Sequence, residues 1–292
     1  MRAVRLHAPG PGGLVIDQIE TPEVGPGEAL VEVHAAAITR DELDWPVDRL
    51  PAIPSYELSG VVSAVAADVL AVAVGDPVYA LTPFDRDGVA AEFAVVPASV
   101  LAPKPSMLDH VASAAIPLAA LSAWQGLFDH GQLEAGERVL IHGAAGGVGH
   151  FATQLARWRG AHVIGTASSG SLDAAREFGA HEAVGRADAV APVDLVFDTV
   201  GGELLKRSPA LVRPGGRLIS VAEEPPATTG IDAAYFVVEP NRDQLIEIAR
   251  LADEGAVRPE VDSVYSLADA TAAFERNQAR GKRGKVVIRV VG

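Results

Sequence analysis

The sequence has no cysteine among its 292 residues, which excludes disulfides, thiol nucleophiles, cysteine-bound zinc and iron–sulfur clusters. The absence of cysteine also fits a reducing cytoplasm, and the first residues lack the apolar segment of a secretory signal. We therefore expect a cytoplasmic protein.

Basic residues are scarce relative to acidic ones. The chain has 24 Lys and Arg against 38 Asp and Glu, which gives a formal net charge of −14. Such a charge argues against nucleic acid or an anionic membrane surface as the main partner, although it does not exclude a local basic pocket for a phosphate.

Membrane-length apolar runs are also scarce. One uncharged stretch, residues 111–128, approaches the length of a membrane span. It is rich in alanine and is interrupted by Ser113, Pro117 and Gln125. We therefore interpret it as a buried helix of a globular domain, with a membrane span as the less favoured alternative.

The residues that are present indicate an α/β protein. Apolar residues make up 49% of the chain and charged residues 21%, as in a globular protein long enough to bury its own core. Residues 31–35, 60–66, 77–81 and 91–96 are short, Val- and Ala-rich runs typical of strands. From Glu137 onward, apolar strands alternate with helical segments, which predicts a parallel sheet covered on both faces.

A glycine-rich turn is the most informative motif. The predicted strand at 138–142 runs into Gly-Ala-Ala-Gly-Gly-Val-Gly at 143–149 and then directly into a predicted helix that ends at Gly160. Small residues let a pyrophosphate approach the backbone, and the helix N-terminus offers N–H groups to the anion. The alternative is a tight turn without a ligand, although so many small residues would then cost stability without a packing gain.

The segment after the second predicted strand indicates which dinucleotide binds. NAD sites place a carboxylate there for the ribose 2′-hydroxyl, but residues 165–170 read Gly-Thr-Ala-Ser-Ser-Gly. Small hydroxyl residues leave room for a 2′-phosphate, so we expect NADPH. Arg186 is the candidate cation for that phosphate, with Arg176 as the second choice, and a solvated surface charge is the alternative for Arg186.

Five segments carry a resemblance to a known family. They are ERVLIHGAAGGVG, FDTVGG, RPGGRLISVA, YFVVEPNRDQL and RGKVVIRV, and the likeness runs along nearly the whole chain. The sequence resembles the zinc-independent quinone oxidoreductases of the medium-chain dehydrogenase/reductase superfamily. The resemblance implies a GroES-like β-rich catalytic domain at 1–110, completed by 264–292, and a Rossmann domain with a doubly wound parallel sheet at 111–263.

The resemblance also implies a set of cofactor-binding residues. The pyrophosphate is expected at Gly143, Gly146, Gly147 and Val148, and the 2′-phosphate at Thr166, Ser168 and Ser169. The ribose is expected between Val200 and Gly201, and the nicotinamide at Ser220, Val221, Phe236 and Val238. Ser122 matches a family threonine that reaches the cofactor. Arg280 falls where some relatives contact the cofactor.

The sequence departs from the family pattern in two places. Where the zinc-dependent branch has Gly-His-Glu with a metal ligand, this chain reads Ser55-Tyr56-Glu57, and its eight histidines show no metal spacing. We therefore expect no metal site. Thr39 stands where the quinone reductases usually carry an asparagine, and Trp45 stands near the position of their aromatic residue.

The expected reaction is hydride transfer to a quinone, which needs one hydrogen-bond donor near the acceptor oxygen. Tyr56 is the first candidate, because it occupies the position of a metal ligand, and Thr39 is the second. Tyr56 could instead be a packed aromatic. Trp45 and Tyr79 could line an apolar slot for the acceptor, or could equally be core residues.

Two other functions compete with quinone reduction. An enone or enoyl reductase would use the same scaffold, and turnover of unsaturated ketones against quinones would separate the two. A non-catalytic NADPH-binding sensor or structural protein would bind the cofactor without acceptor-dependent oxidation. The resemblance also implies a homodimer through the strand near Phe236, which a monomeric mass in sedimentation would reject.

Overall fold

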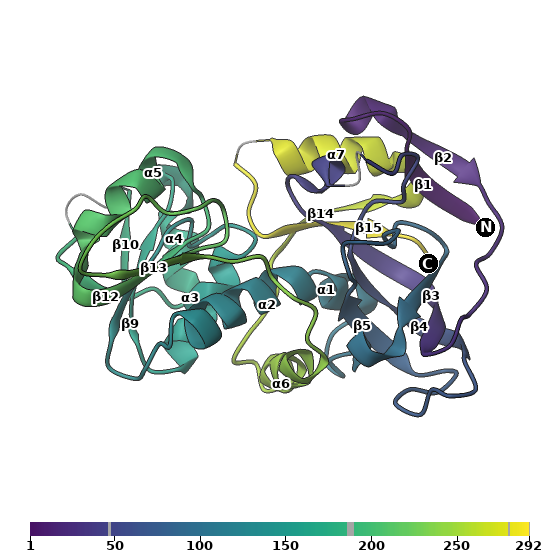
Figure 1. Ribbon diagram of the computed structural model, residues 1–292, viewed down its shortest axis with the longest axis horizontal. Helices are drawn as coiled ribbons and strands as arrows, with labels where there is room; N and C mark the ends of the chain where they lie inside the picture. The colour runs from purple at the N-terminus through teal and green to yellow at the C-terminus, as the bar shows by residue number, and fades with distance from the viewer. Residues whose placement is uncertain (46–47, 186–189, 280, 292) are drawn as a thin grey trace. The chain divides into compact units, whose positions relative to one another are not determined.

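The computed structural model describes residues 1–45, 48–185, 190–279 and 281–291. The chain separates into two compact units, each with its own sheet (Figure 1). Unit 1 contains Met1–Leu118, Glu239–Gly255 and Pro259–Gly292, and unit 2 contains Ala119–Val238 and Ala256–Arg258.

Unit 2 is built on a six-stranded sheet in which every neighbouring pair is parallel. Its strands are β8 (Arg138–Ile141), β9 (His162–Thr166), β10 (Glu182–Val184), β11 (Val193–Asp198), β12 (Val212–Ser220) and β13 (Asp232–Tyr235). Their order is β10-β9-β8-β11-β12-β13, so the winding direction reverses between β8 and β11. This is the doubly wound order of dinucleotide-binding sheets, and it confirms the predicted fold of this part.

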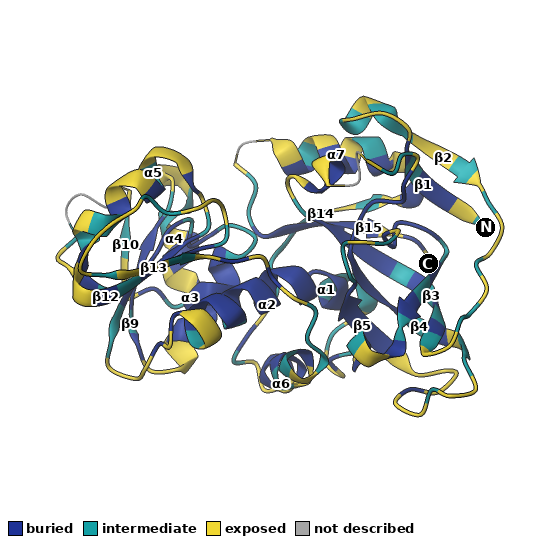
Figure 2. Cartoon of the chain, viewed as in Figure 1, coloured by how far each residue is buried: buried dark blue, intermediate teal, exposed yellow. Residues whose placement is uncertain are grey.

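The central strands of unit 2 are apolar because helices cover the sheet. Leu140, Ile164, Val196 and Leu218, one on each of four strands, are fully buried. Figure 2 shows α5 mostly in the colour of exposed residues. The helices are α2 (Pro117–Trp124), which continues as a π-helical segment (Gln125–His130), α3 (Gly149–Trp158), α4 (Leu172–Glu177) and α5 (Gly202–Arg207).

Unit 1 is built on a mainly antiparallel sheet. Its strand order is β14-β15-β3-β4-β5-β7, and β6 pairs with β3. The strands are β3 (Glu28–Ile38), β4 (Glu57–Val65), β5 (Pro77–Leu81), β6 (Phe93–Pro97), β7 (Ala102–Pro103), β14 (Val261–Ser266) and β15 (Lys285–Arg289). The closing segment of the chain thus returns to the N-terminal sheet, since β15 pairs antiparallel with β3.

Three helices and a hairpin complete unit 1. The helices are α1 (His110–Ala114), α6 (Arg242–Asp253) and α7 (Ala270–Gln278), and the hairpin is β1 (Arg2–Leu6) with β2 (Leu14–Gln18). The core under α7 contains fully buried Val31, Leu58 and Val286 together with Phe274, which is 1% exposed. The sequence patterns did not predict the β1–β2 hairpin or β14.

The compact units differ from the expected domain boundaries around α6. The expected Rossmann domain ran to residue 263, but Glu239–Gly255 lies in unit 1. The reason is a set of hydrogen bonds to unit 1: Tyr79 donates to the Leu245 carbonyl over 2.5 Å, and Arg242 donates to the Leu101 carbonyl over 2.7 Å. β14 also begins before residue 264, in register with β15.

The uncharged stretch 111–128 is interrupted in the structure. α1 ends at Ala114, and α2 begins at Pro117, where proline suits the first turn of a helix. Across the described residues, no helix combines the length and the apolar character needed to span a bilayer.

Candidate functional site

The glycine turn, Gly143–Gly149, connects β8 to α3 beside the end of β11. Gly143 has φ +71°, and a Cβ on it would lie 2.8 Å from Val200 Cγ2. A Cβ on Gly149 would lie 2.0 Å from the Gly143 carbonyl oxygen. The turn is therefore too tight for side chains at these two positions, and it lies at the point where the sheet reverses its winding direction, as dinucleotide sites do.

The start of α3 is suited to an anion. Val148 precedes the helix, no side chain caps it, and its first turn has no acidic residue. Gly146, Gly147 and Val148 are partly exposed, and neighbouring Val200 is 54% exposed. A helix N-terminus with accessible N–H groups and no competing carboxylate fits a pyrophosphate, so the residues present fit the dinucleotide that the sequence predicts.

Asp198, at the end of β11, organises the expected ribose and nicotinamide residues. It is fully buried and accepts hydrogen bonds from the Gly201 N–H and from Ser220 Oγ, both over 3.0 Å. Its backbone carbonyl accepts from the Val221 N–H over 3.1 Å. The Ser220 hydroxyl donates to Asp198 and its carbonyl accepts from the Phe236 N–H over 3.2 Å, so fully buried Ser220 is part of the frame of this segment.

The Thr166 hydroxyl is also used internally. Ser208 Oγ donates to the Leu204 carbonyl, so it accepts from His142 Nε2, 2.8 Å away. Thr166 Oγ1 accepts from the Gly143 N–H over 3.2 Å and lies 3.4 Å from His142 Nδ1. Burial lowers the pKa of His142 to about 4, so the ring is neutral and Nδ1 accepts. This chain of contacts fixes the base of the glycine turn.

Ser168 and Ser169 are the exposed hydroxyl residues beyond β9, and Ser168 Oγ donates to Ser171 Oγ over 3.2 Å. Residues 165–171 contain no carboxylate. Arg176, the second choice for a cation, is held by Asp173 at 2.7 Å. Arg186 lies outside the described residues.

Other cofactor candidates lie on α2, after β13 and before β15. Ser122 is 3% exposed on α2. Phe236 and Val238 follow β13 and are 8% and 9% exposed, and the Phe236 ring stacks on His130 with centroids 4.3 Å apart. Arg280 lies outside the described residues.

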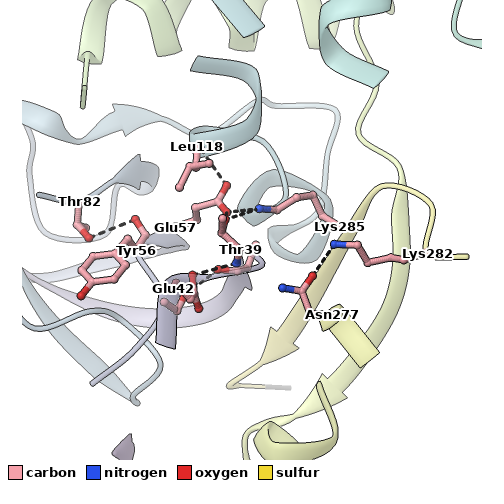
Figure 3. A network of polar contacts seen from close by, with 11 residues as sticks. Thr39, Glu42, Tyr56, Glu57, Thr82, Leu118, Asn277, Lys282 and Lys285 are labelled. Carbon is pink, nitrogen blue, oxygen red and sulfur yellow. Dashed lines mark hydrogen bonds and ion pairs between the residues drawn. The ribbon is translucent and has the colours of Figure 1, made fainter. Parts of the chain in front are cut away.

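A buried polar network in unit 1 contains Thr39, Glu42, Glu57 and Lys285 (Figure 3). Glu57 is fully buried and forms an ion pair with Lys285, which is 3% exposed. Glu57 Oε2 accepts from the Leu118 N–H over 2.8 Å, and Glu57 Oε1 accepts from Thr39 Oγ1 over 3.3 Å. Lys285 Nζ also donates to Thr39 Oγ1 over 3.1 Å.

Glu42 carries the most perturbed carboxyl of this network. It is fully buried, and Oε2 accepts from the Thr39 N–H over 2.9 Å. Burial raises the pKa of Glu42 to about 8, against the opposing effects of the Thr39 N–H and the Lys285 ammonium. Glu42 is therefore protonated at neutral pH, and the network holds a single ion pair.

Tyr56 lies in an aromatic cluster beside the network. Its ring centroid is 5.6 Å from that of Trp45 and 5.3 Å from that of Phe84. Tyr56 is fully buried, its hydroxyl accepts from Arg49 over 2.9 Å, and burial raises its pKa. Trp45 is 37% exposed. Trp45 is thus the exposed member of the cluster, and neighbouring Thr39 is partly exposed.

Tyr79 is placed as a core residue. It is fully buried in β5, and its hydroxyl bonds the backbone of α6. This arrangement leaves Tyr79 no surface for an acceptor, so we do not retain it as a lining residue.

The side chains of Tyr56 and Glu57, in the triplet where the zinc-dependent branch has a metal ligand, and of neighbouring Thr39 do not suit zinc. Thr39 offers a hydroxyl, Tyr56 a phenol held by Arg49, and Glu57 a carboxylate already paired with an ammonium. Within the described part of the chain, no three His, Asp or Glu side chains are grouped to hold a metal ion. Zinc prefers thiolate, imidazole and free carboxylate ligands, so we assign it no step.

Sequence reasoning did not identify Lys285 and Arg49, and it assigned Glu42 no role in proton transfer. Lys285 opens the closing strand directly before three apolar residues, which is a signal that its charge is buried against a partner. Glu42 lies among exposed charges in the loop after β3, and the sequence pattern does not show that its own side chain is buried.

Comparisons with known proteins agree with this architecture. A family model described as an alcohol dehydrogenase GroES-like domain matches residues 25–106, and one described as a zinc-binding dehydrogenase matches residues 172–288. The quinone oxidoreductase structure from Coxiella burnetii superposes with a TM-score of 0.92 and 28% identity, covering 99% of each chain. The GroES-like and Rossmann assignments of the fold are therefore confirmed.

Two curated relatives align over most of the chain. A probable zinc-binding oxidoreductase, mitochondrial, from Arthroderma benhamiae is 33% identical over 300 residues, covering 92% of this chain and 90% of the relative. An NADPH-dependent alkenal/one oxidoreductase, chloroplastic, from Arabidopsis thaliana is 30% identical over 308 residues, covering 93% and 76%. The chain therefore belongs to the medium-chain dehydrogenase/reductase superfamily, among its quinone-oxidoreductase-like NAD(P)H oxidoreductases.

Proposed function

We propose that the protein is an NADPH-dependent, zinc-independent reductase of quinone-type acceptors. The observation that carries the proposal is the glycine turn at the reversal point of the sheet, followed by an uncapped helix start. The exposed Ser168 and Ser169, in a segment of residues 165–171 without a carboxylate, favour a 2′-phosphate over a free ribose hydroxyl.

When bound, NADPH would supply the hydride, and the chain would position the acceptor and stabilise the charge that develops on it. We place Thr39 ahead of Tyr56 as the hydrogen-bond donor. Thr39 is partly exposed, whereas Tyr56 is fully buried and receives a bond from Arg49. Trp45 supplies apolar surface beside them.

A second candidate, reduction of enones, is favoured by one comparison. The Arabidopsis thaliana relative is named as an alkenal/one oxidoreductase, and both reactions need a donor toward a developing oxyanion.

We also propose a homodimer through β13, the edge strand of the unit 2 sheet, next to which Val237 is 59% exposed.

The reductase assignment predicts acceptor-dependent oxidation of NADPH by the purified protein. Turnover is measured from the loss of nicotinamide absorbance with a simple p-quinone and with an α,β-unsaturated ketone. We expect a higher kcat/KM with the quinone, and a higher value with the enone would select the second candidate. Binding of NADPH without turnover of either acceptor would support a non-catalytic binding protein instead.

A further inference from the structure

A buried ammonium lies against a partly exposed hydroxyl in unit 1 (Figure 3). Lys285 Nζ donates to Thr39 Oγ1 over 3.1 Å and also to Glu57. The side chains of Lys285 and Glu57 are 4% and 0% exposed. The ammonium of Lys285 is therefore fixed by its contacts with Thr39 and Glu57 and has almost no exposure to water.

Thr39 is the accessible member of this network. Glu42, Glu57 and Lys285 are buried, whereas Thr39 is partly exposed at the end of β3. Among these four residues, Thr39 is therefore the one that a ligand at the surface of unit 1 could reach.

The Thr39 hydroxyl can turn toward a ligand without leaving a buried group unpaired. Its bond to Glu57 Oε1 is long, at 3.3 Å, and the same oxygen is also bonded by Lys285. Glu57 Oε2 keeps the Leu118 N–H at 2.8 Å. The turned hydroxyl would still accept from the Lys285 ammonium, and a hydroxyl that accepts from a cation is a stronger donor.

We propose that Lys285 is a positioning residue for the reduction, because its ammonium polarises the Thr39 hydroxyl and aims it at the acceptor oxygen. This inference rests on the proposed function and extends it. Thr39 is then the catalytic residue that touches the acceptor, and Lys285 acts through it. The Glu57 carboxylate holds the ammonium in place.

An enone gains a hydride at its β-carbon, the C=C pair shifts toward the carbonyl, and the C=O pair moves onto oxygen, which gives an enolate and NADP⁺. Thr39 donates a hydrogen bond to that oxygen and keeps its proton, and water supplies the proton that completes the saturated ketone. A quinone gains the hydride at one carbonyl oxygen, which becomes a hydroxyl, and the electron pairs shift through the ring onto the other oxygen, which becomes a phenolate. The phenolate is less basic than the enolate and gains less from the donor.

The test compares the isosteric Thr39→Val with the conservative Thr39→Ser on both acceptor classes. We expect Thr39→Val to lower kcat for the enone by about a hundredfold, as loss of an oxyanion donor does, and for the quinone by about tenfold. Thr39→Ser should retain activity within about threefold. The Kd for NADPH, from fluorescence titration, should stay unchanged in both variants.

Lys285 is tested in the double variant Lys285→Met/Glu57→Gln, which removes the ion pair as a unit. We expect an acceptor-dependent loss that does not exceed that of Thr39→Val. When Thr39→Val is added, the total loss should equal that of Thr39→Val alone, because both act through one hydrogen bond. This non-additivity is a readout that a purely structural role of Lys285 would not produce.

Three results would overturn the inference. Equal losses on both acceptors would assign Thr39 a structural role, and full activity of Thr39→Val would remove it from the reaction. Additive losses in the combined variant would separate Lys285 from Thr39. If the unmodified protein binds NADPH but reduces neither acceptor, the proposed function itself is wrong, and this inference fails with it.

Discussion

Lys285→Met should lower the free energy of unfolding by about 3–5 kcal/mol, because it leaves the Glu57 carboxylate buried without its partner. The measurement is urea denaturation at pH 7. The double variant Lys285→Met/Glu57→Gln should recover most of this loss, because a neutral amide can still accept from the Leu118 N–H.

The exposed pair of Lys206 and Glu203 provides the control for this prediction. Its nitrogen and oxygen are 2.7 Å apart on α5, with side chains 63% and 76% exposed. Lys206→Met should leave the unfolding transition unchanged, because solvent screens such pairs. A loss below about 1 kcal/mol in Lys285→Met would contradict the buried charge that we assign to Glu57.

Glu42→Gln should remove the pH dependence of stability that Glu42 produces. The pKa of Glu42 is raised to about 8 in the folded protein, from an ordinary value of 4.5. A raised carboxyl pKa means that the folded state holds the proton more tightly, so stability falls as the pH rises from about 4.5 through 8. The loss amounts to about 4 kcal/mol, and glutamine, which does not titrate, avoids it.

The measurement is the difference in unfolding free energy between the variant and the unmodified protein at pH 5 and at pH 9. The variant should become more stable relative to the unmodified protein by about 4 kcal/mol between pH 5 and pH 9. Glu20→Gln, at an exposed position, controls for the loss of one surface carboxyl. A difference that stays constant between the two pH values would show that Glu42 is ionised in the folded protein.

Much of the fold could be predicted because its signals are local. The alternation of apolar strands and helices predicted the parallel sheet. A strand followed by glycines and then by a helix predicted the turn between β8 and α3. The turn can be identified from the sequence because its backbone requires glycine at positions 143 and 149, where a Cβ has no room.

The network in unit 1 could not be predicted because its contacts are distant in sequence. Glu57 and Lys285 are 228 positions apart and meet only when β15 returns to the N-terminal sheet. Tyr56 was placed first among the donors by its position in a motif, but the motif does not report that the ring is fully buried. Likewise, α6 reads as one more helix of the alternating pattern, and only its bonds to Tyr79 and Leu101 assign it to unit 1.

The most direct test of the account is the thermal shift of the purified protein with NADPH and with NADH, titrated separately. A ligand that binds only the folded state raises Tm by an amount set by its concentration relative to Kd. We predict a larger rise with NADPH than with NADH, and none in Gly149→Ala, because a Cβ there would meet the Gly143 carbonyl oxygen at 2.0 Å. No rise with either cofactor would contradict the assignment of the glycine turn as a dinucleotide site, and an equal or larger rise with NADH would contradict the assignment of the exposed serines to a 2′-phosphate.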